Sequence, residues 1–184
     1  MVTAMNPSEI EQTLAPRSYA EVDAALCEEA DSTLLVLLEC RNKKVGDCAA
    51  DVLVRRCKVE NVAHGILEGK FHTTIGKKRA LYVLHRFGKR FNRAPAAYAH
   101  LLGDRSKSVV DSSLFGLAFL QDKSAIPIVR AAMQRHDRSK PLYLLFDKAV
   151  DALEQEDPFI YSPGFHDAGD AWLLDKVKFG SRIG

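Results

Sequence analysis

The sequence predicts an all-α protein built as a right-handed α-solenoid of about four stacked helical hairpins. Apolar residues recur at steps of three and four along almost the whole chain, which is the period of a helix that buries one face. No stretch shows the sustained alternation and β-branched enrichment of a strand. The tetrapeptide Asp-Arg-Ser-Lys occurs twice, at 104–107 and 137–140, and a fixed offset of 33 residues is typical of repeated hairpins.

The same offset relates two further sets of apolar residues, which places three units in register: Leu84, Leu117 and Val150, and Phe87, Leu120 and Leu153. The tetrapeptide itself is interpreted as the turn between the two helices of a hairpin, because Asp and Ser there can bond their own backbone and cap the next helix. The alternative is that Arg105 and Arg138 form one edge of a binding surface.

Two short helices are predicted before the repeats, because Ser8 with Glu11 and Ser18 with Glu21 have the spacing of a capping box. The predicted hairpins pair residues 32–41 with 47–57, 60–67 with 77–91, 95–102 with 108–121, and 126–135 with 141–155. A polar turn at 42–46 joins the first pair, and a loop rich in glycine and threonine at 69–76 joins the second. Proline suits the first turn of three of these helices.

The helical period ends after Asp157, where an aromatic loop contains Phe159, Tyr161 and Phe165. A short helix over 171–179, with the single tryptophan Trp172, is predicted to follow. We interpret this segment as a cap on the last repeat, and the alternative is that its aromatic residues belong to a binding surface. The chain is thus predicted to be one domain over 1–184, with N-terminal helices (1–31), repeats (32–155) and a cap (156–184).

Two segments resemble a known family of helical repeats. Residues 122–133, DKSAIPIVRAAM, look like an inter-repeat turn followed by a first helix, and residues 110–120, VDSSLFGLAFL, look like the preceding second helix. Over residues 32–155 the chain resembles the HEAT-repeat family, particularly its short bacterial, phycobilin-lyase-type variety. The resemblance implies that the second helix of each hairpin lines a concave face. The Asp that usually precedes that helix is missing before Lys77.

Composition is that of an ordinary soluble protein, with 47% hydrophobic and 27% charged residues. No apolar run approaches the length of about 18 residues that spans a bilayer, and Met1 to Pro7 lack the pattern of a signal peptide. We therefore expect a cytoplasmic protein that does not bind membranes. The cysteines are expected to be reduced, partly buried thiols, because no close pair suggests a metal site: Cys27, Cys40, Cys48 and Cys57.

Basic residues are concentrated in one part of the chain. Residues 41–93 contain 14 Lys or Arg and only four acids, and no acid occurs between Glu68 and Asp104. Such a block indicates an anionic partner, although a solvated helix face is the alternative interpretation. Helical spacing, together with the concave face implied by the resemblance, predicts a partner-binding ridge made of Arg55, Lys78, Tyr82, Arg86, Lys89, Arg90, Arg93 and Lys107.

The predicted partner of this ridge is a protein with an acidic surface, so that the chain would serve as an adaptor, an assembly chaperone or an inhibitor of the immunity type. Nucleic acid is the alternative partner, held by phosphate contacts. Residues 1–31 contain seven acids and one base, which would repel a long polyanion and so favour protein.

The sequence contains no phosphate loop, nucleophile elbow or zinc-binding helix motif, and its six histidines are scattered. No catalytic residue, metal site or cofactor is therefore predicted. One enzymatic alternative follows from the resemblance, since HEAT-like alkylpurine DNA glycosylases use a basic concave face with tryptophans and an aspartate. Tyr82 with Asp111 would be the substitutes here.

Overall fold

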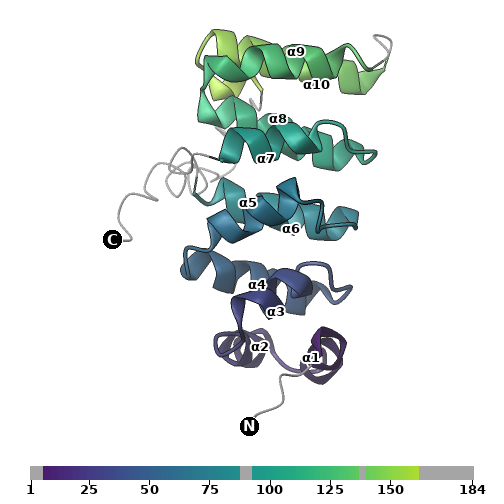
Figure 1. Cartoon of the computed structure of the whole chain (residues 1–184), viewed down its shortest axis with the longest axis vertical. Helices are drawn as coiled ribbons and strands as arrows, with labels where there is room; N and C mark the ends of the chain where they lie inside the picture. The colour runs from purple at the N-terminus through teal and green to yellow at the C-terminus, as the bar shows by residue number, and fades with distance from the viewer. Residues whose placement is uncertain (1–5, 88–92, 137–139, 162–184) are drawn as a thin grey trace. The chain divides into compact units, whose positions relative to one another are not determined.

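The computed structural model describes residues 6–87, 93–136 and 140–161, and within these residues the chain is all-helical, with no strand (Figure 1). The α-helices are α1 (Pro7–Leu14), α2 (Tyr19–Leu26), α3 (Asp31–Leu37), α4 (Lys43–Arg55), α5 (Val59–Leu67), α6 (Thr74–His85), α7 (Ala94–Leu101), α8 (Lys107–Leu120), α9 (Ile126–Met133) and α10 (Pro141–Glu154). Two short 3₁₀ helices, η2 (Lys123–Ala125) and η3 (Pro158–Ile160), follow α8 and α10. The predicted fold class is confirmed at the level of an all-α protein.

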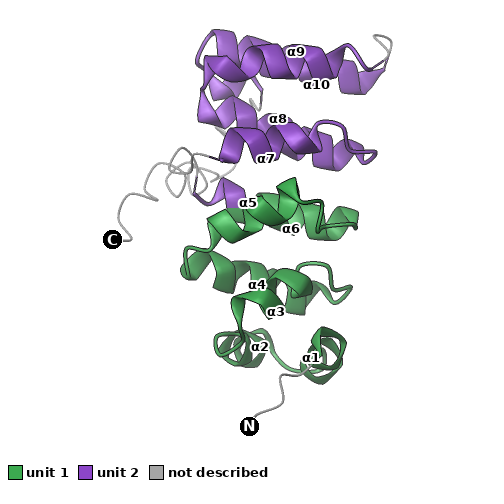
Figure 2. Cartoon of the chain, in the orientation of Figure 1, with its two compact units in different colours: residues 1–83 green, residues 84–184 purple. Residues whose placement is uncertain are grey.

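The chain divides into two compact units, residues 1–83 and 84–184 (Figure 2). In the first unit, α1 packs on α3, and both α2 and α3 pack on α4. In the second unit, α8 packs on α7 and α10, and α9 packs on α10. Helix α6 crosses the division, because its last two residues belong to the second unit. A single domain over 1–184 stays a prediction.

The residues that repeat every 33 positions lie in the core. Leu84, Leu117 and Leu153 are fully buried, and Val150 and Leu120 are buried as well, whereas Phe87 is half-buried. These residues lie on or at the ends of α6, α8 and α10. The offset therefore relates six residues of which five are buried.

The first two helices begin with capping boxes, one of them not where the sequence suggested. At α2, Ser18 Oγ accepts from the backbone N–H of Glu21, and the Glu21 carboxylate accepts from Ser18 N at 2.8 Å, as predicted. At α1 the cap is Asn6 with Glu9, so the pair Ser8 and Glu11 was wrong. Pro7 stands at the first helical position, which moves the start of α1 upstream.

Helices α4 and α6 begin earlier than predicted, because each has a cap inside the expected loop. The Asn42 side chain accepts from Val45 N at 3.1 Å, so α4 starts at Lys43 instead of Asp47. Thr73 Oγ1 accepts from Gly76 N at 2.9 Å, and α6 starts at Thr74 instead of Lys77. The predicted loops at 42–46 and 69–76 are therefore shorter.

The remote carboxylate of Glu39 completes the start of α6. It accepts hydrogen bonds from the backbone N–H groups of His72 (2.9 Å) and Thr73 (3.0 Å). Both N–H groups belong to the residues just before Thr74, the first residue of α6, and a carboxylate next to a helix N-terminus interacts favourably with the helix dipole. Glu39 thus supplies an acidic partner to the segment before α6, where the sequence has no aspartate.

Helices α7 to α10 begin and end within two residues of the predicted bounds, and the first Asp-Arg-Ser-Lys copy lies in the connection between α7 and α8. Asp104 Oδ1 accepts from Ser106 N at 2.7 Å between α7 and α8, while Ser106 precedes α8 without a side-chain cap. Arg105 is exposed. Most of the second copy, residues 137–139 with Arg138, lies outside the described residues, so the alternative of a shared binding edge stays a prediction.

The described part of the C-terminal segment covers the end of the second unit. Helix η3 packs against α8 and α10, and both Pro158 and Tyr161 are buried. The Tyr161 hydroxyl donates to Asp111 Oδ1 at 2.6 Å. A capping role for residues 156–184 stays a prediction, and Phe165, Trp172 and the predicted helix 171–179 lie outside the described residues.

Three described helices end in a non-glycine residue with left-handed backbone. Cys57, Gln121 and Glu156 follow α4, α8 and α10 with φ of 54°, 54° and 55°. After Cys57 and Glu156 the next N–H bonds to the carbonyl five residues back, Lys58 N to Leu53 O at 2.9 Å and Asp157 N to Ala152 O at 3.0 Å. These are Schellman ends, where glycine is the usual residue.

Replacing Cys57 by glycine is therefore expected to stabilise the protein by about 0.5 to 1 kcal/mol. Glycine relieves the left-handed strain, and part of the gain is offset by the greater freedom of the unfolded chain. Cys57 is exposed, so little packing is lost. Urea denaturation measures the change. The matched control is the exposed Cys27, whose φ is −64° and where glycine should destabilise; a lower stability for Cys57→Gly would contradict the strain argument.

Candidate partner-binding surface

Arg79 on α6 is a buried cation that joins three segments of the first unit. Its side chain is 8% exposed, and its Nε donates to Asp47 Oδ1 on α4 at 3.0 Å. The two terminal nitrogens donate to four backbone carbonyls at the end of α3, in the following connection and at the start of α4, those of Leu38 (2.9 Å), Cys40 (2.7 Å), Asn42 (3.3 Å) and Lys43 (3.2 Å). The planar guanidinium suits this arrangement, because its donors point in fixed directions.

Gly46 makes room for this guanidinium. A Cβ at position 46 would lie 2.1 Å from the central carbon of the Arg79 guanidinium, closer than real atoms approach. Gly46 lies in α4, where glycine is otherwise unfavourable by about 1 kcal/mol relative to alanine. The glycine that the sequence analysis assigned to a turn is therefore a helical residue required by the packing of Arg79.

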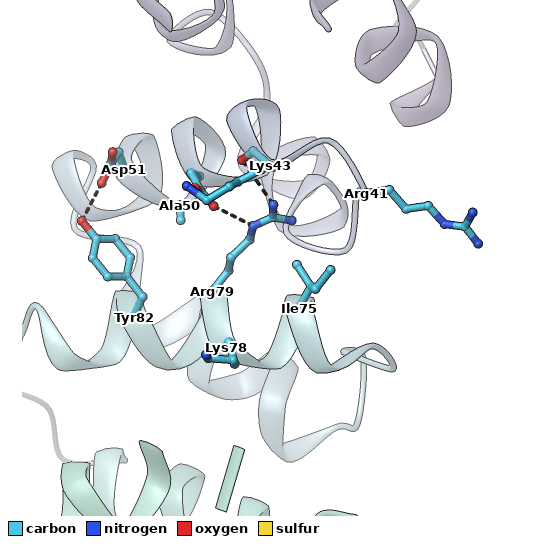
Figure 3. A pocket seen from close by; sticks show the side chains of 9 residues that line it. Arg41, Lys43, Ala50, Asp51, Ile75, Lys78, Arg79 and Tyr82 are labelled. Atoms are coloured by element: carbon cyan, nitrogen blue, oxygen red, sulfur yellow. Dashed lines mark hydrogen bonds and ion pairs between the residues drawn. The ribbon is translucent and has the colours of Figure 1, made fainter. Parts of the chain in front are cut away.

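A pocket of about 570 Å³ opens between α4 and α6 next to this buried cation (Figure 3). Its lining residues are Arg41, Lys43, Asp47, Ala50, Asp51, Ile75, Lys78, Arg79 and Tyr82. Arg79 and Tyr82 both point from α6 toward α4, whereas the Arg41 side chain extends away from the other lining residues (Figure 3). All nine residues belong to the first unit, and we call this site the α4–α6 pocket.

Both acids of the α4–α6 pocket have a bonding partner among its lining residues. Asp47 binds Arg79 and is also 3.3 Å from Lys43 Nζ, and the Tyr82 hydroxyl donates to Asp51 Oδ1 at 2.7 Å. Arg41 and Lys78, by contrast, are exposed and form no ion pair with another residue of the described chain. The surface of the pocket therefore presents positive charge that its own acids do not neutralise.

An apolar side chain lies beside these cations. Ile75, in the first turn of α6, is 48% exposed although large apolar residues are usually covered. Ala50 of α4 also lines the pocket but is 1% exposed, so Ile75 supplies the uncovered apolar contact. The α4–α6 pocket thus combines exposed cations with an uncovered apolar contact, which is the combination a protein segment with acidic and apolar side chains would use.

Two residues of the predicted ridge line the same pocket, and none of the other four that the structure describes is among its lining residues. Lys78 and Tyr82 line the α4–α6 pocket. Arg55, near the end of α4, donates instead to Asp23 Oδ1 on α2 at 2.6 Å. Arg86, Arg93 and Lys107 belong to the second unit, where Arg86 is half-buried and the other two are exposed. Lys89 and Arg90 lie outside the described residues.

Acids of the N-terminal segment neutralise part of the basic block. Asp31 accepts from Arg56 at 2.9 Å and from Lys58 at 3.0 Å, and hydrogen bonds from Lys58 and then Arg56 lower the pKa of its carboxyl. Arg56 also donates to the backbone carbonyls of Cys27 and Glu29. The acidic segment and the basic block are therefore partners within the first unit, which the charge count along the chain did not reveal.

Sequence reasoning missed most residues of the pocket, including Arg41, Lys43, Asp47 and Ile75, although a signal was present. The long-range pairs join residues about one repeat apart: 31 residues for Asp51 and Tyr82, 32 for Asp47 and Arg79, and 33 for Glu39 and His72. Searching for opposite charges near the 33-residue offset would have identified Asp47 as the partner of Arg79.

The residues considered for glycosylase chemistry have other partners. The Tyr82 hydroxyl binds Asp51 in the first unit, and Asp111 accepts from Tyr161 in the second. Burial and hydrogen bonding to Asp111 raise the pKa of the Tyr161 hydroxyl, so Tyr161 stays protonated and donates to the carboxylate. Tyr82 and Asp111 of the suggested pair therefore each have a hydrogen-bond partner within their own unit.

The four cysteines are free thiols, of which Cys40 and Cys48 are buried and Cys27 and Cys57 are exposed. Burial raises the pKa of the Cys40 thiol to about 11, which keeps it protonated and unreactive at neutral pH. The prediction of buried thiols is therefore confirmed for two of the four.

Within the described ranges, no cluster of three or more His, Cys, Asp or Glu side chains is arranged to hold a metal ion. None of the helices in the described part of the chain has both the length and the hydropathy that a bilayer span requires. No family model, curated protein or solved structure matches this chain.

Proposed function

We propose that this chain is a HEAT-like α-solenoid scaffold without catalytic activity, and that it binds an acidic segment of a protein partner at the α4–α6 pocket. Three features support the repeat architecture: the 33-residue offset of buried residues, the packing of α3 on α4, α7 on α8 and α9 on α10, and pairs such as Asp47 with Arg79, 32 residues apart. Adaptor, assembly chaperone and inhibitor or immunity protein are the roles that such a scaffold serves, and the four free thiols suit the cytoplasm.

The single observation that carries the binding proposal is the contrast between paired and exposed charges in the α4–α6 pocket. Arg79 donates its hydrogen bonds to groups within the protein, so it holds the first unit together and is not available to a partner. Arg41 and Lys78 remain at the surface beside Ile75, on a cavity of about 570 Å³. Carboxylates of a partner would meet Arg41 and Lys78, while an apolar side chain would cover Ile75.

A protein segment fits this pocket better than nucleic acid. Asp47 and Asp51 are among the lining residues and would repel a phosphate backbone, which carries a charge at every nucleotide. Asp23 and Asp31 reduce the positive field of the basic block still further. A peptide can place its carboxylates on Arg41 and Lys78 and avoid Asp51, because its charges are separated by neutral residues.

Lys78→Glu is expected to weaken binding of an acidic peptide by about tenfold, which corresponds to roughly 1.4 kcal/mol. The probe is a fluorescein-labelled, end-blocked peptide of glutamates around a central leucine, titrated with the full chain and followed by anisotropy. A second peptide has glutamine in place of each glutamate. It should bind the parent chain at least about tenfold more weakly than the acidic peptide does. Affinity for the acidic peptide should fall as salt is raised.

Lys148→Glu provides the matched control, since Lys148 is an exposed lysine within α10 of the second unit. It should leave peptide binding unchanged. Equal losses for both variants would indicate a general charge effect and contradict the proposed site. If a DNA or RNA duplex binds more tightly than the acidic peptide at the same salt concentration, and Lys78→Glu weakens that binding, nucleic acid replaces protein as the partner.

A further inference from the structure

The two acids that line the α4–α6 pocket differ in how their charges are balanced. Asp47 Oδ1 lies 3.0 Å from Arg79 Nε, and Asp47 Oδ2 lies 3.3 Å from Lys43 Nζ. Asp51 accepts a hydrogen bond from the Tyr82 hydroxyl at 2.7 Å, and this donor carries no charge. In the part of the chain that the structure describes, Asp51 forms no ion pair. Its side chain is half-buried, so a negative charge without a counter-ion stands at the surface of the pocket.

The charges of the α4–α6 pocket are arranged along its length. Helices α4 and α6 run side by side in the same direction, because the bonded pairs that join them advance together along both helices, Asp47 with Arg79 and then Asp51 with Tyr82. Asp51 and Tyr82 lie together at one end of the pocket, and Arg41 lies at the other end (Figure 3). The pocket therefore has an acidic end and a basic end.

A purely acidic segment bound in this pocket would leave the charge of Asp51 unbalanced. Covering a pocket removes water from the groups at its surface, and a charge that loses its water without gaining a counter-ion raises the free energy of the complex. Asp47 avoids this cost, because its own ion pairs are already formed. The exposed cations of the pocket avoid it as well, because they would meet the carboxylates of the partner. Asp51 is therefore the lining residue that requires a positive group from the partner.

We propose that the segment bound at the α4–α6 pocket is dipolar, with acidic side chains for Arg41 and Lys78 and a basic side chain for Asp51. This proposal rests on the function proposed above and specifies the partner of the same site. The Tyr82 hydroxyl binds Asp51 Oδ1, and Oδ2 can accept from an ammonium or guanidinium group of the partner. Because the acidic and basic ends of the pocket are separate, the segment binds in one direction only.

The length of the pocket sets the spacing of these side chains in the partner. Ile75 and Tyr82 both line the pocket and lie seven residues apart within α6, which corresponds to about 10.5 Å along the helix axis. An extended chain advances about 3.3 Å per residue, so about three residues span this distance. An apolar residue that covers Ile75 and a basic residue that reaches Asp51 beside Tyr82 are therefore about three positions apart.

The test adds one lysine to the labelled, end-blocked peptide of glutamates around a central leucine, three positions from the leucine. One version carries the lysine on the N-terminal side and another on the C-terminal side, which presents both chain directions. Two reference peptides carry Nε-acetyl-lysine at the same positions, so that the stem is kept and the charge is removed. In anisotropy titrations with the full chain, one lysine version should bind at least about fivefold more tightly than its acetylated reference, and the other should show no such gain.

Asp51→Asn tests whether Asp51 provides this gain. Asparagine keeps an oxygen that accepts from the Tyr82 hydroxyl and removes the charge, so the gain from lysine should vanish. The acetylated peptides should bind Asp51→Asn at least as tightly as they bind the parent chain, because no acid then repels their glutamates. Asp147→Asn is the matched control, since Asp147 is an exposed acid within α10 of the second unit, and it should leave the gain unchanged. Circular dichroism and urea denaturation establish that each variant is folded.

Two results would overturn the dipolar partner. The first is a gain from lysine that is absent from both versions or equal in both, and the second is a gain that persists in Asp51→Asn. If either is found while Lys78→Glu still weakens binding of the acidic peptide, the α4–α6 pocket remains the proposed site and its partner is acidic only. If Lys78→Glu leaves that binding unchanged, the site itself is wrong, and both proposals are overturned.

Discussion

Replacement of Arg79 by methionine is expected to lower the free energy of unfolding by about 3 to 5 kcal/mol. The change leaves Asp47 without its buried partner and removes the donors from the carbonyl groups of Leu38, Cys40, Asn42 and Lys43. A buried acceptor left without a hydrogen bond costs about 1 to 3 kcal/mol, although Lys43, 3.3 Å from Asp47, will recover part of the loss. The pocket should lose its framework along with the stability.

Urea denaturation followed by circular dichroism measures this effect, and two variants accompany it. Arg41→Met changes an exposed arginine that lines the same pocket and should alter the stability by less than about 0.5 kcal/mol. Arg79→Lys should recover only part of the loss, because an ammonium group cannot reach Asp47 and four carbonyls at once. If the free energy of unfolding of Arg79→Met is close to that of the parent chain, the expectation is wrong. Water would then hydrogen-bond to Asp47 and the four carbonyl groups as well as the guanidinium does.

The helices could be predicted because each has a local cause. Proline at the first turn and apolar residues at helical steps place α9 and α10 within about two residues of their observed ends. The starts of α4 and α6 were predicted too late for a different reason. Asn42 and Thr73 cap these helices, and the backbone N–H groups before α6 are satisfied by Glu39, more than 30 residues away. A window along the chain does not contain that partner.

The candidate site was predicted only in part, because a cation's role depends on what lies opposite it in space. Lys78 and Arg79 are neighbours in sequence and identical in formal charge. Lys78 is nevertheless exposed, whereas Arg79 is buried and donates five hydrogen bonds. Helical spacing placed Lys78 and Tyr82 on one face correctly. It could not show that Asp23 holds Arg55, since the ion pair depends on how α2 packs against α4.

Acidification is expected to destabilise the protein by up to about 3 kcal/mol through His85, the last residue of α6. The His85 ring stacks on Tyr98 at 5.5 Å and meets the edge of Phe115 at 5.4 Å. Its Nε2 lies 3.1 Å from the Ser112 carbonyl oxygen, which can only accept, so the single proton of the neutral ring is on Nε2. Burial lowers the pKa of His85 from 6.5 to about 4.

The sign of the effect follows from this lowered pKa. The unfolded chain takes up the proton near pH 6.5 and the folded chain only near pH 4, so the contribution of neutral His85 is fully present above pH 6.5. It declines as the pH falls through that interval and is constant below pH 4. Carboxylates such as Asp31 also lose stability on acidification, so the quantity to measure is the difference between the parent chain and His85→Gln.

His85→Gln separates the packing of the ring from its protonation. Glutamine can keep a donor for the Ser112 carbonyl but has no proton to gain, so the stability difference between parent and variant should be constant above pH 6.5 and shrink by up to about 3 kcal/mol toward pH 4. Urea unfolding across this pH range gives the difference, and the NMR titration of the His85 ring gives its pKa directly. Parallel pH profiles for the two proteins would mean that the ring is hydrated and that Tyr98 and Phe115 do not exclude water from it. The ring could instead titrate near pH 4 while the stability difference stays constant. The pKa of His85 would then be equally low in the unfolded chain, which would require His85 to remain packed against aromatic residues there.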